Sequence, residues 1–217
     1  RRQRQMCIRD SIRAVYNQFG PDNSAADSNS GHGTHITGII VGNGTLDNQT
    51  LGIAPAAEVN FYQIEYDTSG LLARWGTLYS MFSHSLQNQA RTHTNAWGSV
   101  NQPGEYTADS HSADSFIVDQ PAYLAIFSGG DIGQNQGATT TPPGTAKNVL
   151  TIGASTTGMG GTDPQGSVWS NNSGGTLDGR VKPDLVAPGV EICSARASEA
   201  TSVAGSDCSI AIDQDAT

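Results

Sequence analysis

One histidine of this 217-residue chain lies in a setting that suits acid–base chemistry. His32 sits between two glycines in the stretch Ser30-Gly31-His32-Gly33-Thr34-His35-Ile36-Thr37-Gly38, where a helix is predicted to begin. The helix start holds the histidine, while the glycines leave the backbone beside it clear for another chain. A histidine placed in this way can act as a general base that meets a nucleophile and a substrate together.

Two other roles remain open for His32. Together with His35 it has the i, i+3 spacing of a metal-binding pair, although no Glu or Cys with ligand spacing accompanies the pair in the sequence. It also fits a structural histidine at a helix start. We expect His32 to be the base and His35 to pack or to form a hydrogen bond.

The elements that must position these residues follow from hydrophobic periodicity. A helix is predicted over residues 31–41, with Ser30 as its cap. The other expected elements are a strand at 59–66, a turn at 67–70, a helix at 71–90, a strand at 93–97, a helix at 112–119, and strands at 123–127 and 149–153. Strands alternating with helices predict an α/β fold with a doubly wound, mostly parallel sheet and helices on both faces. In such sheets functional groups gather at the carboxyl ends of the strands.

Composition narrows the class of partner. The formal net charge is −9, with 20 acidic residues against 11 Lys and Arg, and the only lysines are Lys147 and Lys182. An acidic, lysine-poor chain argues against nucleic acid or an anionic membrane as partner. No apolar run is long enough for a transmembrane helix, and the composition suits a secreted protein.

Several blocks of the chain, in the order expected, resemble motifs of the subtilisin-like serine proteases, or subtilases. They are residues 29–44 around His32, 51–55, 93–98, 143–148 and 178–189, and they are most similar to the branch of oxidatively stable alkaline proteases. The resemblance implies a subtilisin-like fold and a serine endopeptidase that works through an acyl-enzyme, with His32 as its base. It also implies a peptide or protein substrate, a propeptide, secretion, and no cofactor for catalysis.

Two members of the family's catalytic triad have no match in this chain. The family's aspartate lies well before the histidine, followed by Ser or Thr and Gly, whereas Asp27 lies in the loop just before His32 and Asp22 in a turn-like stretch. Ser202 lies in Ala-Thr-Ser-Val-Ala, which lacks the family's first Gly and its following Pro. We therefore expect the aspartate to precede this sequence, the nucleophilic serine to follow it, and the 217-residue chain alone to be inactive.

The ends of the chain support the same expectation. Residues 1–10 resemble the translation of a transposase adapter used in preparing sequencing libraries, so we exclude them from the fold. The alternative is a basic N-terminal arm. On the adapter interpretation, residues 11–217 are a partial subtilase catalytic domain truncated at both ends.

The resemblance places Asp131 where subtilases carry the asparagine that donates an N–H to the oxyanion. An ionised carboxylate has no proton to donate and repels the developing negative charge. Three interpretations stay open: a protonated Asp131 that donates an O–H, with activity rising as pH falls; an enzyme that tolerates a weaker oxyanion hole; or a catalytically degenerate binding or structural module. A sequencing error is a fourth, since Asn and Asp codons differ by one base.

The resemblance also implies a pocket with two walls for the substrate residue that precedes the scissile bond. The walls are Ala96, Trp97 and Gly98 on one side and Ser128, Gly129 and Gly130 on the other. Their small residues let the substrate backbone lie alongside as an added strand, whereas the alternative is ordinary tight strand packing. By the same analogy we expect a cis peptide bond before Pro143.

Two further features concern stability rather than chemistry. Asp47 and Asn48 lie in a loop where many subtilases hold a structural calcium, and their oxygens could serve as ligands; the alternative is a solvated polar loop. Cys193 and Cys208 bracket a polar stretch and are either disulfide-bonded or two free thiols.

Overall fold

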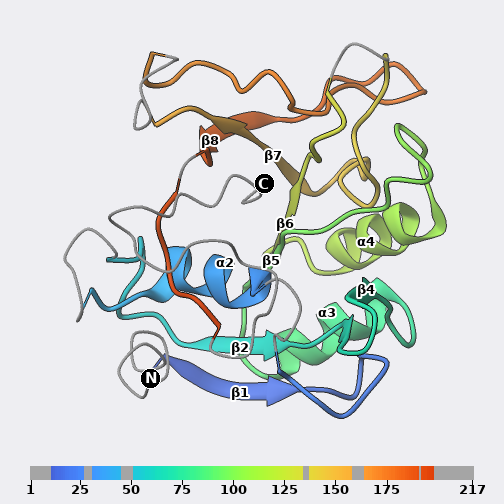
Figure 1. The fold of residues 1–217 in the computed structure, drawn as a ribbon. Coiled ribbons are helices and arrows are strands. Elements are labelled where there is room, and N and C mark those ends of the chain that lie inside the picture. Colours follow the sequence, from blue (N-terminus) through green and yellow to red (C-terminus); the bar gives the residue numbers. More distant parts are fainter. Residues whose placement is uncertain are drawn as a thin grey trace. The chain divides into compact units, whose positions relative to one another are not determined.

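A computed structural model describes residues 11–26, 31–44, 51–133, 137–157, 164–190 and 192–197 (Figure 1). The chain forms two compact units. The first comprises residues 1–76 and 192–216, and the second comprises residues 77–191 and residue 217. The first unit is therefore discontinuous in sequence, because the chain leaves it, completes most of the second unit and returns.

The first unit contains a two-stranded parallel sheet and one helix. β1 (Ile12–Tyr16) pairs in parallel with β2 (Val59–Tyr62), and α2 (His32–Val41) lies between them in the sequence. The Tyr16 and Tyr62 rings, on paired residues, are 5.0 Å apart. A helix between two parallel strands is the usual way to join them, because parallel strands need a long crossover.

The chain turns sharply after β2, so the single strand predicted over 59–66 is wrong in its second half. β3 (Glu65–Tyr66) pairs with β4 (Leu71–Leu72) in an antiparallel hairpin, closed by the predicted turn at 67–70. The break occurs at Gln63, which is buried and whose amide donates hydrogen bonds to the carbonyl of Glu65 and the carboxylate of Asp22.

The second unit is built on a four-stranded, wholly parallel sheet. Its order is β5 (Thr92–Asn95), β6 (Leu124–Ser128), β7 (Leu150–Ser155) and β8 (Leu185–Pro188). The predicted α/β fold with a parallel sheet is confirmed. The edge strand β8 was not predicted from the sequence, although its residues form a short apolar run. Its side chains are mostly exposed.

Two helices of the second unit begin at different residues from those predicted. α3 (Leu78–Gln87) starts after the predicted residue 71, because Leu71 and Leu72 belong to the hairpin and a capping box between Thr77 and Ser80 fixes the helix start. α4 (Ala108–Asp119) starts before the predicted residue 112, and the Thr107 hydroxyl caps it.

The helices α3 and α4 lie on one side of β5 and β6 (Figure 1). An aromatic cluster joins these helices to the sheet. The ring of the fully buried Phe82 lies 4.9 Å from His93, 5.6 Å from Tyr123, 5.7 Å from Phe116 and 6.4 Å from Phe127. Because Phe82 and Phe116 come from α3 and α4, this cluster fixes both helices against the strands that lead to the predicted walls. None of the helices in the described ranges combines the length and apolar character needed to cross a membrane.

Candidate active site

His32 is the first residue of α2, as the predicted helix over 31–41 requires. The N-cap is Gly31, not the predicted Ser30, which lies outside the described residues. Gly31 has a φ of +75°, a left-handed conformation that glycine adopts without the steric cost of a Cβ atom. The side chain of His32 is partly exposed at this helix start, so it is accessible to another group.

Residues 192–197 return to the first unit and lie along α2 (Figure 1). The buried ring of His35 contacts the Ile192 carbonyl through Nε2 at 3.2 Å, and the Ser194 hydroxyl donates to the His35 carbonyl at 2.7 Å. A Cβ atom on Gly38 would collide with the Ser194 hydroxyl, so glycine lets this segment approach closely. The predicted hydrogen-bonding role of His35 is confirmed, and the described residues hold no cluster of three His, Cys, Asp or Glu suited to a metal.

The structure brings the two predicted walls to the same edge of the sheet in the second unit. Residues 96–98 follow β5, and residues 128–130 begin at the last residue of β6. The strands are neighbours in parallel register, with Asn95 opposite Phe127. The Trp97 ring also lies edge-on to the Phe127 ring, 5.7 Å away, so the walls leave the sheet side by side.

The segment with Pro142 and Pro143, which the resemblance places near this site, joins the two walls. The Pro142 carbonyl accepts a hydrogen bond from Ser99 N–H at 2.8 Å, beyond the first wall. The Thr141 N–H donates to the Gly129 carbonyl of the second wall at 2.9 Å. The peptide bond between Pro142 and Pro143 is cis, as the resemblance implied. In the sequence, the two adjacent prolines indicate that the backbone of this segment is restricted in conformation.

Asn95 ties the two strands together directly below the walls. Its side chain is almost fully buried, and its amide donates to the Ile126 carbonyl of β6 at 3.1 Å. This bond crosses from β5 to β6 one residue before the first wall begins, and thereby fixes the spacing between the two chain segments.

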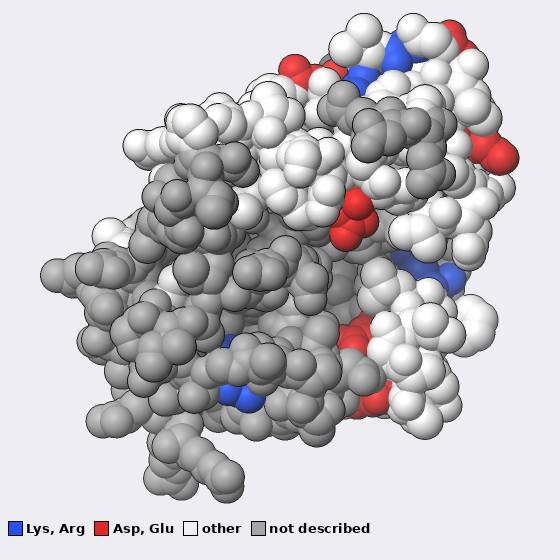
Figure 2. Space-filling model, turned by 45° about the horizontal axis from the view of Figure 1, so that its top comes forward, with Lys and Arg blue, Asp and Glu red and all other residues white. Residues whose placement is uncertain are grey.

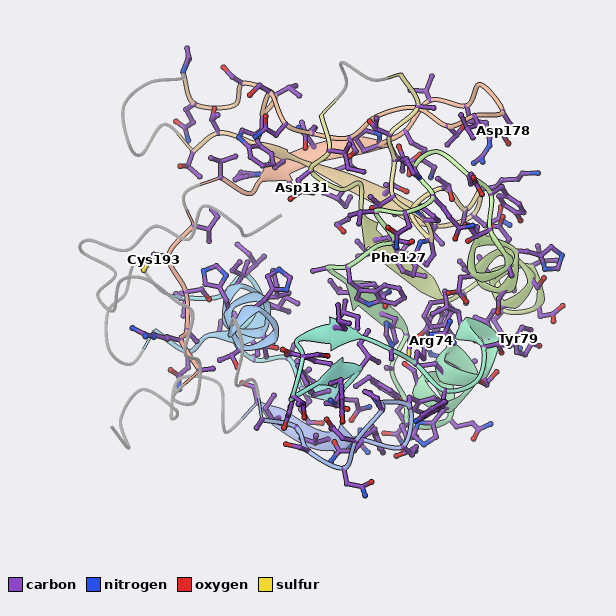
Figure 3. The ribbon with its side chains drawn as sticks, turned by 45° about the vertical axis from the view of Figure 1, so that its right-hand side comes forward. Arg74, Tyr79, Phe127, Asp131, Asp178 and Cys193 are labelled. Atoms are coloured by element: carbon purple, nitrogen blue, oxygen red, sulfur yellow. The ribbon has the colours of Figure 1, made fainter. Side chains whose placement is uncertain are left out.

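Asp131 lies just beyond the second wall, and its side chain is exposed (Figure 3). The interpretation in which a protonated Asp131 donates an O–H requires a buried side chain, because burial disfavours a charged carboxylate. The structure instead places this side chain in contact with solvent. The backbone on both sides of Asp131 is held by hydrogen bonds to Ser173, which sequence reasoning did not identify.

Several other predicted residues have structural roles or fall outside the described ranges. The Asp22 carboxylate accepts hydrogen bonds from Ser24 N–H at 3.1 Å and Asp67 N–H at 3.0 Å, which accounts for its position in the turn. Cys193, labelled in Figure 3, is disulfide-bonded. Both other cysteines lie outside the described residues, so pairing with Cys208 stays a prediction. The predictions for Asp27, Asp47, Asn48 and Ser202 also fall outside these ranges.

Charge is dispersed on the face of the molecule shown in Figure 2. The described acidic and basic side chains there lie singly or in small groups rather than in one continuous patch. Among the described residues, Arg180 and Asp178 form a local ion pair, with Nε and Oδ2 2.9 Å apart.

The model of the subtilase family matches residues 9–211 of the chain. The serine protease/ABC transporter B family protein tagA of Dictyostelium discoideum is 30% identical over 154 residues, covering 68% of this chain and 9% of that protein. Subtilisin-like protease 5 of Arthroderma otae is 30% identical over 192 residues, covering 85% of this chain and 41% of that protein. The solved CspB protease of Clostridium perfringens has the same fold, with a TM-score of 0.66 at 12% identity over 87% of this chain and 73% of that one. The chain thus spans less than half of the length of these two curated relatives.

Proposed function

Because the chain belongs to the subtilase family of serine proteases, we propose that the protein containing it is a serine endopeptidase that works through an acyl-enzyme. The observation that carries the proposal is the pairing of β5 with β6, which places residues 96–98 beside residues 128–130. The Trp97 ring packs against Phe127, and the other wall residues have small side chains or none, so the two parallel segments can accept an extended peptide as an added strand.

In the proposed reaction His32 takes the proton of a serine hydroxyl as its oxygen attacks the carbonyl carbon of the substrate. The protonated His32 then returns that proton to the leaving amine, and water releases the acyl group by the same route. The serine, and the aspartate that orients His32, would come from a longer protein. On this proposal the 217-residue chain alone does not hydrolyse peptides.

Asp131 decides how efficient the proposed enzyme is. A carboxylate at the position of the usual asparagine donates no hydrogen bond while it is ionised, so the developing oxyanion would rely on the backbone N–H of the nucleophile. The exposure of Asp131 supports this weaker oxyanion hole over a hole in which a buried carboxylic acid is the donor.

The same exposed carboxylate favours a second candidate function. A subtilase-like module that has lost catalysis could keep the two walls for binding a peptide and carry Asp131 without a penalty. The two proposals differ in whether the longer protein contains the serine motif and turns over substrate.

A serine-directed fluorophosphonate and a casein hydrolysis assay, both applied to a longer protein containing this sequence, test the proposal. We expect covalent labelling and hydrolysis, with both lost in His32→Ala and both retained in the control His111→Ala, an exposed histidine on α4. A folded protein that binds peptide but is neither labelled nor active would establish the binding module instead.

We further propose that the protein is secreted, carries a propeptide and acts on peptide or protein substrates. The disulfide at Cys193 supports an oxidising compartment. A calcium ion held by Asp47 and Asn48 would act on stability alone. Thermal unfolding with and without a calcium chelator tests that part, and an unchanged melting temperature would exclude it.

A further inference from the structure

Both peptide groups that flank Asp131 are hydrogen-bonded to one residue. The Ser173 N–H donates to the Gly130 carbonyl at 2.9 Å, and that carbonyl belongs to the peptide group that enters Asp131. The Ile132 N–H, from the peptide group that leaves Asp131, donates to the Ser173 hydroxyl oxygen at 3.0 Å. Because two fixed peptide planes determine φ and ψ of the residue between them, Ser173 sets the direction in which the Asp131 side chain leaves the backbone.

Ser173 is itself firmly held. Its side chain is fully buried, and the neighbouring Asn172 is almost so. The Asn172 side chain accepts from Ala154 N–H at 2.7 Å and donates to the Ala154 carbonyl at 2.6 Å, which anchors the segment to β7. The carbonyl of Asn171 accepts from Gly133 N–H at 2.9 Å, which extends the contact past Ile132. The loop with Asp131 thus rests on a support continuous with the sheet.

Thr139 closes the other side of the same loop. Its hydroxyl donates to the Gly133 carbonyl at 2.6 Å and accepts from Gly174 N–H at 3.0 Å, while its own N–H donates to the Gly174 carbonyl at 2.8 Å. The described loop residues 130–133 are therefore hydrogen-bonded at each end to segments in which Thr139, Ser173 and Gly174 are buried. The backbone of this loop is thus held by hydrogen bonds on both sides, although the Asp131 side chain is exposed.

We propose that Ser173 is a positioning residue that fixes the direction of the Asp131 side chain beside the proposed position of the oxyanion. The proposal rests on the proposed function, because it assigns Asp131 to the reaction. Ser173 touches neither substrate nor reacting atoms; it acts through the Gly130–Asp131–Ile132 backbone. A fixed donor or charge needs no rearrangement during the reaction, which is why a small displacement of such a group lowers the rate.

Amide hydrogen exchange on the 217-residue chain tests the support independently of catalysis. We expect Ser173→Ala to speed exchange at Ile132 about tenfold, since its acceptor is lost. The control Ser85→Ala removes another buried hydroxyl, which accepts from Tyr123, and should leave Ile132 within about twofold. Ser173→Cys, with a weakly accepting sulfur, serves if the alanine variant does not fold. Unchanged exchange at Ile132 in the folded variant would overturn the proposal.

Kinetics on a longer, active protein test the catalytic part. In the Asp131→Asn background, where the side chain can donate a hydrogen bond to the oxyanion, Ser173→Ala should lower kcat about tenfold and leave KM within about twofold. Ser173→Ala should have no such effect in the Asp131→Ala background. An equal loss of kcat in both backgrounds would mean that Ser173 acts on the structure and not through Asp131. If Asp131→Ala leaves kcat unchanged, the assignment of Asp131 fails and the catalytic part falls with it. The exchange measurement still decides separately whether Ser173 holds the loop, and an inactive wild-type protein would count against the proposed function.

Discussion

A Cβ atom added to Gly130 would lie 2.6 Å from Cγ2 of Thr141. The first wall meets the same residue, because a Cβ atom on Gly98 would collide with the Thr141 hydroxyl. Thr141 therefore packs against the glycine of each wall, and the distance between the walls depends on the absence of side chains at both positions.

Gly130→Ala should destabilise the protein by about 2–3 kcal/mol, since the new methyl group has no space and the φ of +97° is unfavourable for alanine. Gly166→Ala is the matched control, because Gly166 has a φ of +84° but no heavy atom within 4 Å of an added Cβ. Its cost should be about 1 kcal/mol, from the backbone alone. Urea unfolding of both variants measures the difference, and equal losses would show that Thr141 moves aside.

Phe82→Ala should cost about 3–5 kcal/mol of unfolding free energy, because it leaves a cavity in the middle of the aromatic cluster. Phe82→Leu retains most of the volume and should cost clearly less. Tyr66→Ala provides the comparison, since this aromatic side chain is 42% exposed; it should cost under about 1 kcal/mol. Similar melting temperatures for the two alanine variants would contradict the assignment of the core.

His93 should make the protein less stable in mild acid. Burial lowers the pKa of His93 to about 4, whereas a histidine in the unfolded chain has a pKa near 6.5. The unfolded state therefore binds more protons between these values, and stability falls as pH drops from about 6.5 to about 4, by about 3 kcal/mol in all. His93→Phe keeps a ring against Phe82 and should remove this part of the pH dependence in urea unfolding, whereas the exposed His111→Gln should not.

Asp131→Asn should raise kcat of the longer protein at neutral pH, because an amide donates a hydrogen bond without carrying negative charge. An increase of about a hundredfold to a thousandfold would match the contribution of one such donor in other hydrolases. If a protonated Asp131 is the donor, the variant should also lose the rise of activity towards acid pH. Asp178→Asn replaces another exposed aspartate and should leave kcat unchanged; no change in kcat or its pH profile with Asp131→Asn would exclude a role in the oxyanion hole.

The parallel strands next to the site were largely predictable from the sequence. β6 and β7 are apolar runs that must be buried from both faces, and the glycines after β6 mark the end of the strand. The hairpin was not predictable from periodicity, because Leu71 and Leu72 extend the apolar spacing of α3 backwards. Local hydrogen bonds at Gln63 and the cap at Thr77 decided the outcome there, and a hydrophobic pattern carries no information about either.

The sequence nominates residues whose chemistry belongs to their own side chain, such as His32 and Asp131, and their roles stay predictions. The site was not predictable where a residue acts on the backbone of a distant segment. Ser173 supports the Asp131 loop through one N–H and one hydroxyl. The sequence contains many other serines, and nothing in its local pattern distinguishes Ser173 from them. Only the fold brings the two segments together.

The discontinuity of the first unit sets an order of events during synthesis. A ribosome delivers α2 early, but Ile192 and Ser194, which hold His35 and the first turns of that helix, emerge only after residues 77–191. The helix that begins with His32 therefore obtains its last support after both walls of the second unit have left the ribosome. If the proposed function is right, the proposed base would lack this support until the residues of both walls have been synthesised.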